Sequence, residues 1–374
     1  MKVLNKLNDP ELGKKIVGRV KEVACRAAEK LGRQVVLMEV CGTHTTSISR
    51  MGLRSLMAGL VELRSGPGCP VCVTGAEDIE RMLLLSRIPG VEVATFGDMV
   101  RVPGKNNSLE GERARGSSVK IIYSPQDALT LARETPDLEI VFLGIGFETT
   151  APLTALTVKN AQALNLKNFS VYSAHKLVPP VMRTLLNSGN CQVDGFILPG
   201  HVSAVTGSRA FNFIGEEFGI PGIVSGFTPM DILDSIYHLL TLILQGEHRI
   251  KNVYRCVVRD EGNKEAQKTM AECFHTGDAY WRGLGLVPES GLYWRDTYTS
   301  YDAAQKFDLK KIVPANPAGC RCGELLQGII TPWDCALFDE QCTPAHPVGP
   351  CMVSSEGACF AYYRFEGSGV RNGL

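Results

Sequence analysis

Short apolar segments alternate with helical segments through most of this chain, and the alternation limits the folds that are open to it. Val35-Val36-Leu37-Met38 is a continuous apolar run, which is typical of a strand covered on both faces. Comparable strands, most of them followed by a helical segment, are predicted at 91–96, 119–123, 139–143, 169–173, 195–198 and 220–224. Strands that alternate with helices indicate an α/β protein whose parallel sheets are covered by helices.

The helical segments and the chain length suggest how this α/β pattern is divided. Helices are predicted at 10–31, 77–85, 125–133 and 231–244. A chain of 374 residues exceeds what one hydrophobic core usually supports, so two or three domains are expected. After Gln245 the alternation weakens, and glycine, proline and aromatic residues become more frequent. We therefore expect one α/β lobe at 1–123, a second at 124–245, and a third domain of short elements at 246–374.

The charge balance excludes some classes of partner. Lys plus Arg and Asp plus Glu both number 39, so the formal net charge is zero. Proteins that bind nucleic acids or membrane surfaces normally carry a basic patch, so neither partner is expected. The polar N-terminus lacks the apolar core of a signal peptide, and no apolar run is long enough for a membrane span. A cytoplasmic protein is expected.

A loop rich in glycine and proline presents two thiols. Cys69 and Cys72 lie in Ser65-Gly66-Pro67-Gly68-Cys69-Pro70-Val71-Cys72. Glycine permits a close backbone approach and proline fixes φ, so this segment is shaped as a loop. A Cys-x-x-Cys pair can form a disulfide or bind one metal. Because no second pair follows at the spacing of a zinc ribbon, the sequence favours a redox dithiol.

The remaining cysteines concentrate near the C-terminus. Six of the thirteen lie in the last 55 residues, which in a reducing compartment indicates metal or redox chemistry. Twelve, six and sixteen residues separate four of them in turn: Cys322, Cys335, Cys342 and Cys359. Four thiolates can hold zinc or a [4Fe–4S] cluster, and this wide spacing favours the cluster. Buried cysteines without a metal are the third interpretation.

Polar residues follow several of the predicted strands. Cys41 and His44 come after the first strand, and Asp98 follows the strand at 91–96. Ligands of parallel sheets gather outside the carboxyl ends of the strands, so one cleft is expected, together with Glu148, His175 and His201. At a helix N-terminus the helix dipole would lower the pKa of the Cys41 thiol. The alternative is a buried, unreactive cysteine.

Six motifs occur along nearly the whole chain in this order: Cys41-Gly42-Thr43-His44, Gly66-Pro67-Gly68-Cys69-Pro70-Val71-Cys72, Phe96-Gly97-Asp98-Met99, Gly146-Phe147-Glu148-Thr149-Thr150, Pro199-Gly200-His201-Val202-Ser203 and Ser354-Ser355-Glu356-Gly357-Ala358-Cys359. Together they resemble the HypD family of [NiFe]-hydrogenase maturation factors. The resemblance implies two Rossmann-like or thioredoxin-like lobes and a smaller C-terminal domain that carries a [4Fe–4S] cluster. It also implies a redox-active scaffold on which the Fe(CN)2CO unit is assembled with HypC and HypE.

The resemblance also implies roles for individual residues. Cys41 matches the cysteine that binds iron together with a cysteine of HypC, and His44 and Asp98 match polar residues of the same cleft. Cys69 and Cys72 match the redox pair, and HypE would deliver the cyanide. The cluster ligands would be Cys322, Cys335, Cys342 and Cys359. Cys320 and Cys351 lie close to them in the sequence, so Cys320 competes with Cys322 as a ligand.

Two other functions fit parts of the same pattern. A stand-alone, ferredoxin-dependent thiol–disulfide oxidoreductase would have the cluster and the dithiol but no bound iron centre. A zinc-stabilised binding module would have neither the cluster nor redox chemistry. In the leading interpretation the chain is a monomer outside its complexes.

Overall fold

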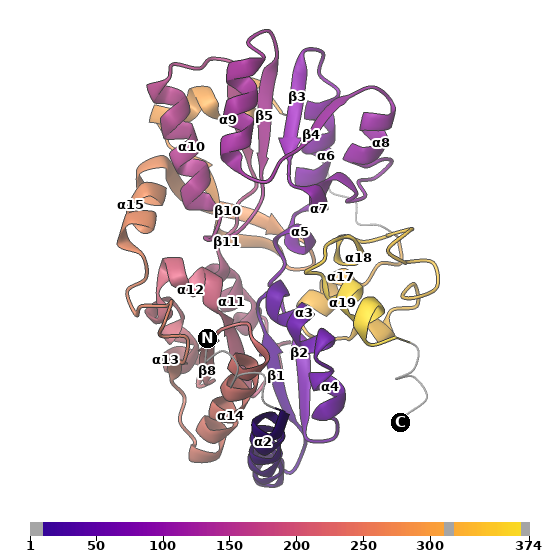
Figure 1. Cartoon of the computed structure of the whole chain (residues 1–374), viewed down its shortest axis with the longest axis vertical. Coiled ribbons are helices and arrows are strands. Elements are labelled where there is room, and N and C mark those ends of the chain that lie inside the picture. Colours follow the sequence, from indigo (N-terminus) through magenta and orange to yellow (C-terminus); the bar gives the residue numbers. More distant parts are fainter. Residues whose placement is uncertain (1–9, 310–317, 368–374) are drawn as a thin grey trace.

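The computed structural model describes residues 10–309 and 318–367 and contains two parallel β-sheets. Figure 1 shows the sheets one above the other along the long axis, with a β-hairpin between them and the C-terminal helices along one side. The expected parallel sheets with helical cover are confirmed. Within the described residues, none of the helices combines the length and the apolar character that a membrane span requires.

The lower sheet has five parallel strands in the order β2-β1-β7-β8-β9. They span Val35–Glu39 (β1), Val61–Ser65 (β2), Gly195–Pro199 (β7), Gly222–Ser225 (β8) and Ile250–Asn252 (β9). Helices α2 (Pro10–Leu31) and α14 (Pro229–Gln245) pack against each other and against this sheet. The sequence did not indicate β2, because its residues alternate between buried and half-buried positions instead of forming an apolar run.

The upper sheet has four parallel strands in the order β4-β3-β5-β6. They span Val91–Thr95 (β3), Ser118–Ile121 (β4), Glu139–Gly144 (β5) and Phe169–Ser173 (β6). Four helices cover it: α6 (Ala76–Ser86), α8 (Leu109–Ala114), α9 (Pro125–Glu134) and α10 (Ala151–Ala163). All four strands of this sheet lie where the sequence predicted strands.

The chain crosses between the sheets twice, so the sheets do not follow the expected ranges 1–123 and 124–245. Strands β1 and β2 form part of the lower sheet, β3 to β6 form the upper sheet, and β7 to β9 return to the lower one. The limit at 123/124 falls inside the upper sheet, between β4 and α9. Parallel neighbours need a long connection between them. In the lower sheet, β1 pairs with β7, and the residues that connect these two strands form the upper sheet. As domain limits, the expected ranges stay predictions.

The region after residue 245 contains one long antiparallel hairpin. Strands β10 (Phe274–Trp281) and β11 (Gly285–Trp294) follow α15 (Lys264–Cys273) and pair along most of their length. The expectation of short elements was wrong for this hairpin. It is right for 318–367, where the elements are α17 (Cys322–Leu326), η3 (Pro332–Asp334), α18 (Pro350–Val353) and α19 (Ala358–Phe365). Between the two parts lie η2 (Asp296–Tyr301) and α16 (Ala303–Lys306).

Short helices occupy the chain after the strand ends: α3 (Gly42–Arg50), α4 (Leu53–Leu56), α5 (Pro70–Val73), α7 (Gly97–Val100), α11 (Val178–Asn187), α12 (Gly200–Thr206), η1 (Ser208–Phe211) and α13 (Asn212–Phe218). Four of them carry candidate residues: His44 in α3, Cys72 in α5, Asp98 in α7 and His201 in α12. Helix α19 packs against α3, and α18 packs against α5. One continuous core cluster includes Cys69 and Cys72 together with Cys322, Cys342 and Cys359. The C-terminal region is therefore joined to the strand ends and does not form a separate core.

Candidate functional site

Cys41 lies at the junction between β1 and α3. Its backbone is extended and it occupies the N-cap position of α3. The side chain is 8% exposed. Burial, with the nearby charges of Glu356 and Glu39, raises the pKa of the Cys41 thiol to about 12, although the N–H groups of His44 and Thr43 act in the opposite direction. The expected lowering by the helix N-terminus was therefore wrong, because desolvation of the thiolate outweighs the helix N–H groups.

Glu39, the last residue of β1, holds the backbone of Cys41 and the side chain of Thr45. One carboxyl oxygen accepts a hydrogen bond from Cys41 N at 3.0 Å, and the other accepts one from the Thr45 hydroxyl. Glu39 is 1% exposed, and burial raises its pKa to about 7. The carboxyl group thus connects the end of the strand to the first turn of α3.

Cys69 and Cys72 form a disulfide at the start of α5. Cys69 is the N-cap residue, and its sulfur accepts a hydrogen bond from Cys72 N at 3.2 Å. The preceding residue, Gly68, lies directly against Cys41. An added Cβ at Gly68 would overlap the backbone N and Cα of Cys41, and Gly42 N donates a hydrogen bond to Gly68 O at 3.0 Å. The iron-binding candidate and the candidate redox pair are therefore in one site.

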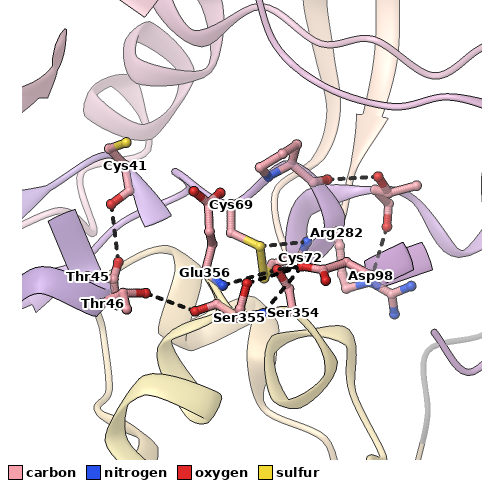
Figure 2. Close-up of a disulfide and its surroundings, with 12 residues drawn as sticks. Cys41, Thr45, Thr46, Cys69, Cys72, Asp98, Arg282, Ser354, Ser355 and Glu356 are labelled. Carbon is pink, nitrogen blue, oxygen red and sulfur yellow. Dashed lines mark hydrogen bonds between the residues drawn. A yellow bond between two sulfur atoms is a disulfide. The ribbon is translucent and has the colours of Figure 1, made fainter. Parts of the chain in front are cut away.

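A C-terminal segment, Ser354 to Glu356, covers this site. Figure 2 shows Glu356 between Cys41 and the disulfide, and Asp98 on the far side of the disulfide. Thr43 Oγ1 donates a hydrogen bond to Glu356 Oε1 at 2.7 Å, and an added Cβ at Gly42 would overlap Glu356. Burial raises the pKa of Glu356, and Asp98 raises it further. The segment that carries Glu356 is thus packed against the Cys41 helix.

Asp98 holds the same segment from the other side. It lies in α7, at the carboxyl end of β3 in the upper sheet. Its Oδ2 accepts hydrogen bonds from Ser354 Oγ at 3.0 Å and from Ser355 N at 3.3 Å. Asp98 therefore joins the upper sheet to the C-terminal segment over the disulfide.

His44 is buried and neutral beside Cys41. Burial lowers its pKa to about 4. Its Nε2 lies 2.8 Å from Gly226 O, and because a carbonyl only accepts, Nε2 carries the proton. Nδ1 has no hydrogen-bond partner among the described residues. The ring stacks on Phe227, which also stacks on His201, so the structure brings His44 and His201 together.

The single cleft expected for all the residues at strand ends does not form. Cys41, His44 and His201 gather at the lower sheet, and Asp98 reaches them through the C-terminal segment. His175 instead lines a polar cavity with Lys176 and Tyr172, and Glu148 lines a separate cavity beside α11 and α15. The residues that follow the strands of the upper sheet therefore lie in separate sites.

The C-terminal cysteines gather around a second site. Five thiols line one small cavity, together with Leu325, Leu337, Phe338 and Met352: Cys320, Cys322, Cys335, Cys342 and Cys359. Cys320 Sγ lies 3.1 Å from Cys322 Sγ. Across residues 10–309 and 318–367, no three His, Cys, Asp or Glu side chains converge as ligands of a single metal ion. Several thiols in an apolar pocket are the donor set that an iron–sulfur cluster uses, so these residues fit such a group.

Of the two additional cysteines, Cys320 is placed as an alternative to Cys322, whereas Cys351 is not in contact with the cavity. Cys320 lines the cavity as Cys322 does, and a Cβ at Gly349 would overlap both sulfurs. Cys351 is fully buried in α18 but does not line the cavity.

Sequence reasoning gave no role to three residues of the site: Glu39, Arg282 and Glu356. Glu39 lies two positions before Cys41, directly after the apolar run that predicts the first strand, so no local pattern marks it as part of a site. Arg282 is 6% exposed, and its Nε donates to Thr74 O at 3.2 Å, just after α5. It also lines a pocket with Cys320 and Cys322. Arg282 therefore lies between α5 and the cysteine cavity. This position follows from the tertiary fold and not from a local sequence pattern.

Comparison with known proteins places the chain in a family. The family model described as "HypD: Hydrogenase formation hypA family" matches residues 13–366. The chain is 41% identical over 373 residues to "Hydrogenase maturation factor HypD" of Rhodobacter capsulatus, with 98% of this chain and 99% of that protein covered. It is 40% identical over 367 residues to the protein of the same name from Escherichia coli K12, with 98% of each covered. The chain therefore belongs to the HypD family of hydrogenase maturation factors.

Proposed function

We propose that this chain is a scaffold on which the Fe(CN)2CO unit of [NiFe]-hydrogenase is assembled, with Cys41 as its ligand to the iron. The observation that carries the proposal is the contact between the Cys41 junction and the Cys69–Cys72 loop through Gly42 and Gly68. A metal-binding thiol and a two-electron thiol couple thereby share one buried site. Soft thiolate ligands suit iron that carries cyanide and carbon monoxide.

Cys41 would bind the iron as a thiolate, so its proton leaves when the metal binds. The N–H groups of Thr43 and His44, which already face the sulfur, would stabilise the negative charge. Glu39 would keep the thiol in place through its hydrogen bond to Cys41 N. His44 and Asp98 would serve the same site. His44 would do so with its Nδ1, which has no hydrogen-bond partner among the described residues, and Asp98 by holding the covering segment.

Cys69 and Cys72 would act as the redox pair of the site. Reduction of the disulfide takes up two electrons and two protons and gives two thiols. Reoxidation returns the two electrons for chemistry at the iron. Their side chains are 4% and 0% exposed, which protects the dithiol from exchange with small thiols in solution.

Cys322, Cys335, Cys342 and Cys359 would hold a [4Fe–4S] cluster, with Cys320 as the alternative to Cys322. Such a cluster supplies one-electron transfer when it is bound. The core that joins these cysteines to Cys69 and Cys72 supports a functional connection between the two sites. Arg282, between the two sites, would favour negative charge on the cysteine side.

The proposed partners are a HypC-type chaperone, which would provide a second cysteine to the iron, and a HypE-type protein, which would provide cyanide. Membership in a family of hydrogenase maturation factors supports this assignment. A stand-alone thiol–disulfide oxidoreductase would use Cys69 and Cys72 but would have no need of Cys41. The two functions therefore make different predictions for one substitution.

Complementation of a bacterial strain that lacks its own HypD tests the proposal. The wild-type chain should restore hydrogenase activity, whereas Cys41→Ser and Cys69→Ser should each abolish it. Cys25→Ser and Cys256→Ser are matched controls, because both thiols are exposed and lie outside the site. Full activity with Cys41→Ser but none with Cys69→Ser would favour the oxidoreductase, and full activity with both would contradict either function.

A further inference from the structure

A buried arginine in the turn of the hairpin β10–β11 lacks an anionic partner. Arg282 is 6% exposed. Its backbone N donates a hydrogen bond to Val73 O at 2.9 Å, and its Nε donates one to Thr74 O at 3.2 Å, so the residue is held against the end of α5. Among the described residues, its Nη1 and Nη2 have no hydrogen-bond partner and its guanidinium group has no ion pair. A buried cation without a counter-charge is costly, so an anion at these two atoms would stabilise the site.

The guanidinium group can be reached from a pocket. Nη1 and Nη2 are not among the fully enclosed polar atoms, so both keep accessible surface although the residue as a whole is buried. Arg282 lines a pocket of about 170 Å³, whose wall at Cys320, Arg321 and Cys322 is shared with the apolar cysteine cavity. Because a water molecule takes up about 30 Å³ in the liquid, this pocket has room for a small organic anion.

Apart from its thiols, the pocket lining carries one net positive charge. Arg321 and Glu324 neutralise each other in an ion pair, so the charge of Arg282 is the one left over. The cost of removing an anion from water rises with the square of its charge, whereas its attraction to one cation rises only in proportion, so a singly charged anion is favoured. The end of a guanidinium group presents its two Nη atoms as a planar fork, which matches the two oxygens of a carboxylate.

We propose that this pocket binds a small monocarboxylate through Arg282. The two carboxylate oxygens accept hydrogen bonds from Nη1 and Nη2, while Nε keeps its bond to Thr74 O. Because the backbone N and Nε are already held, the guanidinium group is in place before the acid binds. This inference goes beyond the proposed function and does not rest on it, because it requires neither iron at Cys41 nor a cluster.

The test uses fluoroacetate as the probe, and the broadening of its fluorine NMR signal by the full chain measures binding. The broadening should be saturable, and acetate should displace the probe. Acetamide has the shape of acetate without the charge, so it should compete about tenfold less well, because hydrogen bonds between charged groups are stronger than those with a neutral partner. Sulfate, which carries two charges, should also compete less well than acetate.

Three variants locate the binding. Arg282→Met removes the charge and should abolish the saturable broadening. Arg295→Met is the matched control and should leave binding unchanged, because Arg295 also donates from Nε to a backbone carbonyl, Ala271 O at 2.8 Å, but is exposed.

Glu324→Ala tests the pocket without changing the buried arginine. It releases Arg321 from its ion pair and removes a negative charge from the lining, so acetate should bind about threefold more tightly. The proposal would be overturned by a lack of saturable broadening, by equal competition from acetate and acetamide, or by stronger competition from sulfate. Binding that is unchanged in Arg282→Met or in Glu324→Ala would overturn it as well, and so would its loss in Arg295→Met.

Discussion

Single glycine residues set the separation between the reactive segments of the site. Gly68 and Gly42 occupy the places where the Cys69 loop, the Cys41 junction and Glu356 approach most closely. At both positions a side chain would meet atoms that cannot move easily, because the backbone of Cys41 or of Glu356 is among them. The sequence showed that glycine shaped this loop, but not which segment the loop had to approach.

Gly68→Ala should therefore separate Cys41 from the disulfide loop. We expect it to lower the free energy of unfolding by about 1–3 kcal/mol, the usual cost of overpacking. Denaturant unfolding measures this change. Gly97→Ala is the matched control, because its Cβ would meet only Ile121 at an ordinary contact distance of 3.8 Å. Equal stability of the two variants would contradict the close packing at Cys41.

The buried carboxyl group of Glu148 should make stability depend on pH. Burial raises its pKa from an ordinary value of 4.5 to about 7 in the folded chain. Folding therefore favours the protonated form, so the contribution of this group is complete below about pH 4.5 and is lost as pH rises through 7. The loss amounts to about 3 kcal/mol for this shift.

Glu148→Gln removes that contribution, because an amide does not titrate in this range. The difference in unfolding free energy between wild type and variant should move in favour of the variant as pH rises from about 4.5 to above 7. Denaturant unfolding across this range measures it. A difference that stays constant with pH would show that Glu148 has an ordinary pKa in the folded chain.

At the scale of elements, the sequence predicted those whose residues carry a strong periodic signal. The strands β1 and β5 are buried on both faces, and their apolar runs identified them. Strand β2 and the hairpin β10–β11 were missed, because alternating or mixed residues give a weak local signal. The order of strands within the sheets was also missed, since parallel partners are distant in sequence.

Local sequence signals also predicted part of the site, but not all of it. Local motifs identified Cys41, Asp98 and the Cys69–Cys72 pair, and the structure brings them together around one disulfide. The roles of Glu39 and Arg282 follow from contacts that no local pattern shows. The pKa of Cys41 could not be predicted either, because it depends on burial by a segment more than 300 residues away.

Asp98 should control how firmly the C-terminal segment covers the disulfide. Its carboxylate accepts hydrogen bonds from Ser354 and Ser355, and bonds to a charged group contribute about 1.5–3 kcal/mol. Asp98→Ala should therefore increase amide hydrogen exchange in 354–359 by roughly tenfold or more. Hydrogen exchange with mass spectrometry measures this.

Asp127→Ala is the control for that experiment. Asp127 belongs to the capping box of α9, a helix that covers the upper sheet, and none of its described hydrogen bonds reaches the C-terminal segment. It should affect exchange near 123–127 and leave 354–359 unchanged. If Asp98→Ala leaves exchange in 354–359 unchanged, Asp98 does not hold the segment.

For the whole molecule, the site depends on three parts of the chain that fold together. The lower sheet provides Cys41, the loop after β2 provides the disulfide, and the C-terminal region provides Glu356 and the cysteine cavity. The ion pair of Arg54 with Glu366, at 2.6 Å, further ties α4 to the residue after α19. The C-terminal region is therefore part of the iron-binding site that we propose, in addition to holding the cysteines proposed as cluster ligands.

The central claim is that Cys41 holds the iron of the Fe(CN)2CO unit, and infrared spectroscopy tests it most directly. The chain is purified without oxygen, in complex with its HypC-type partner, from cells that make all the maturation proteins. The complex should show cyanide and carbon monoxide stretches, which Cys256→Ala, at an exposed cysteine, should retain. The account predicts that Cys41→Ala loses these bands, and their survival in that variant would contradict it.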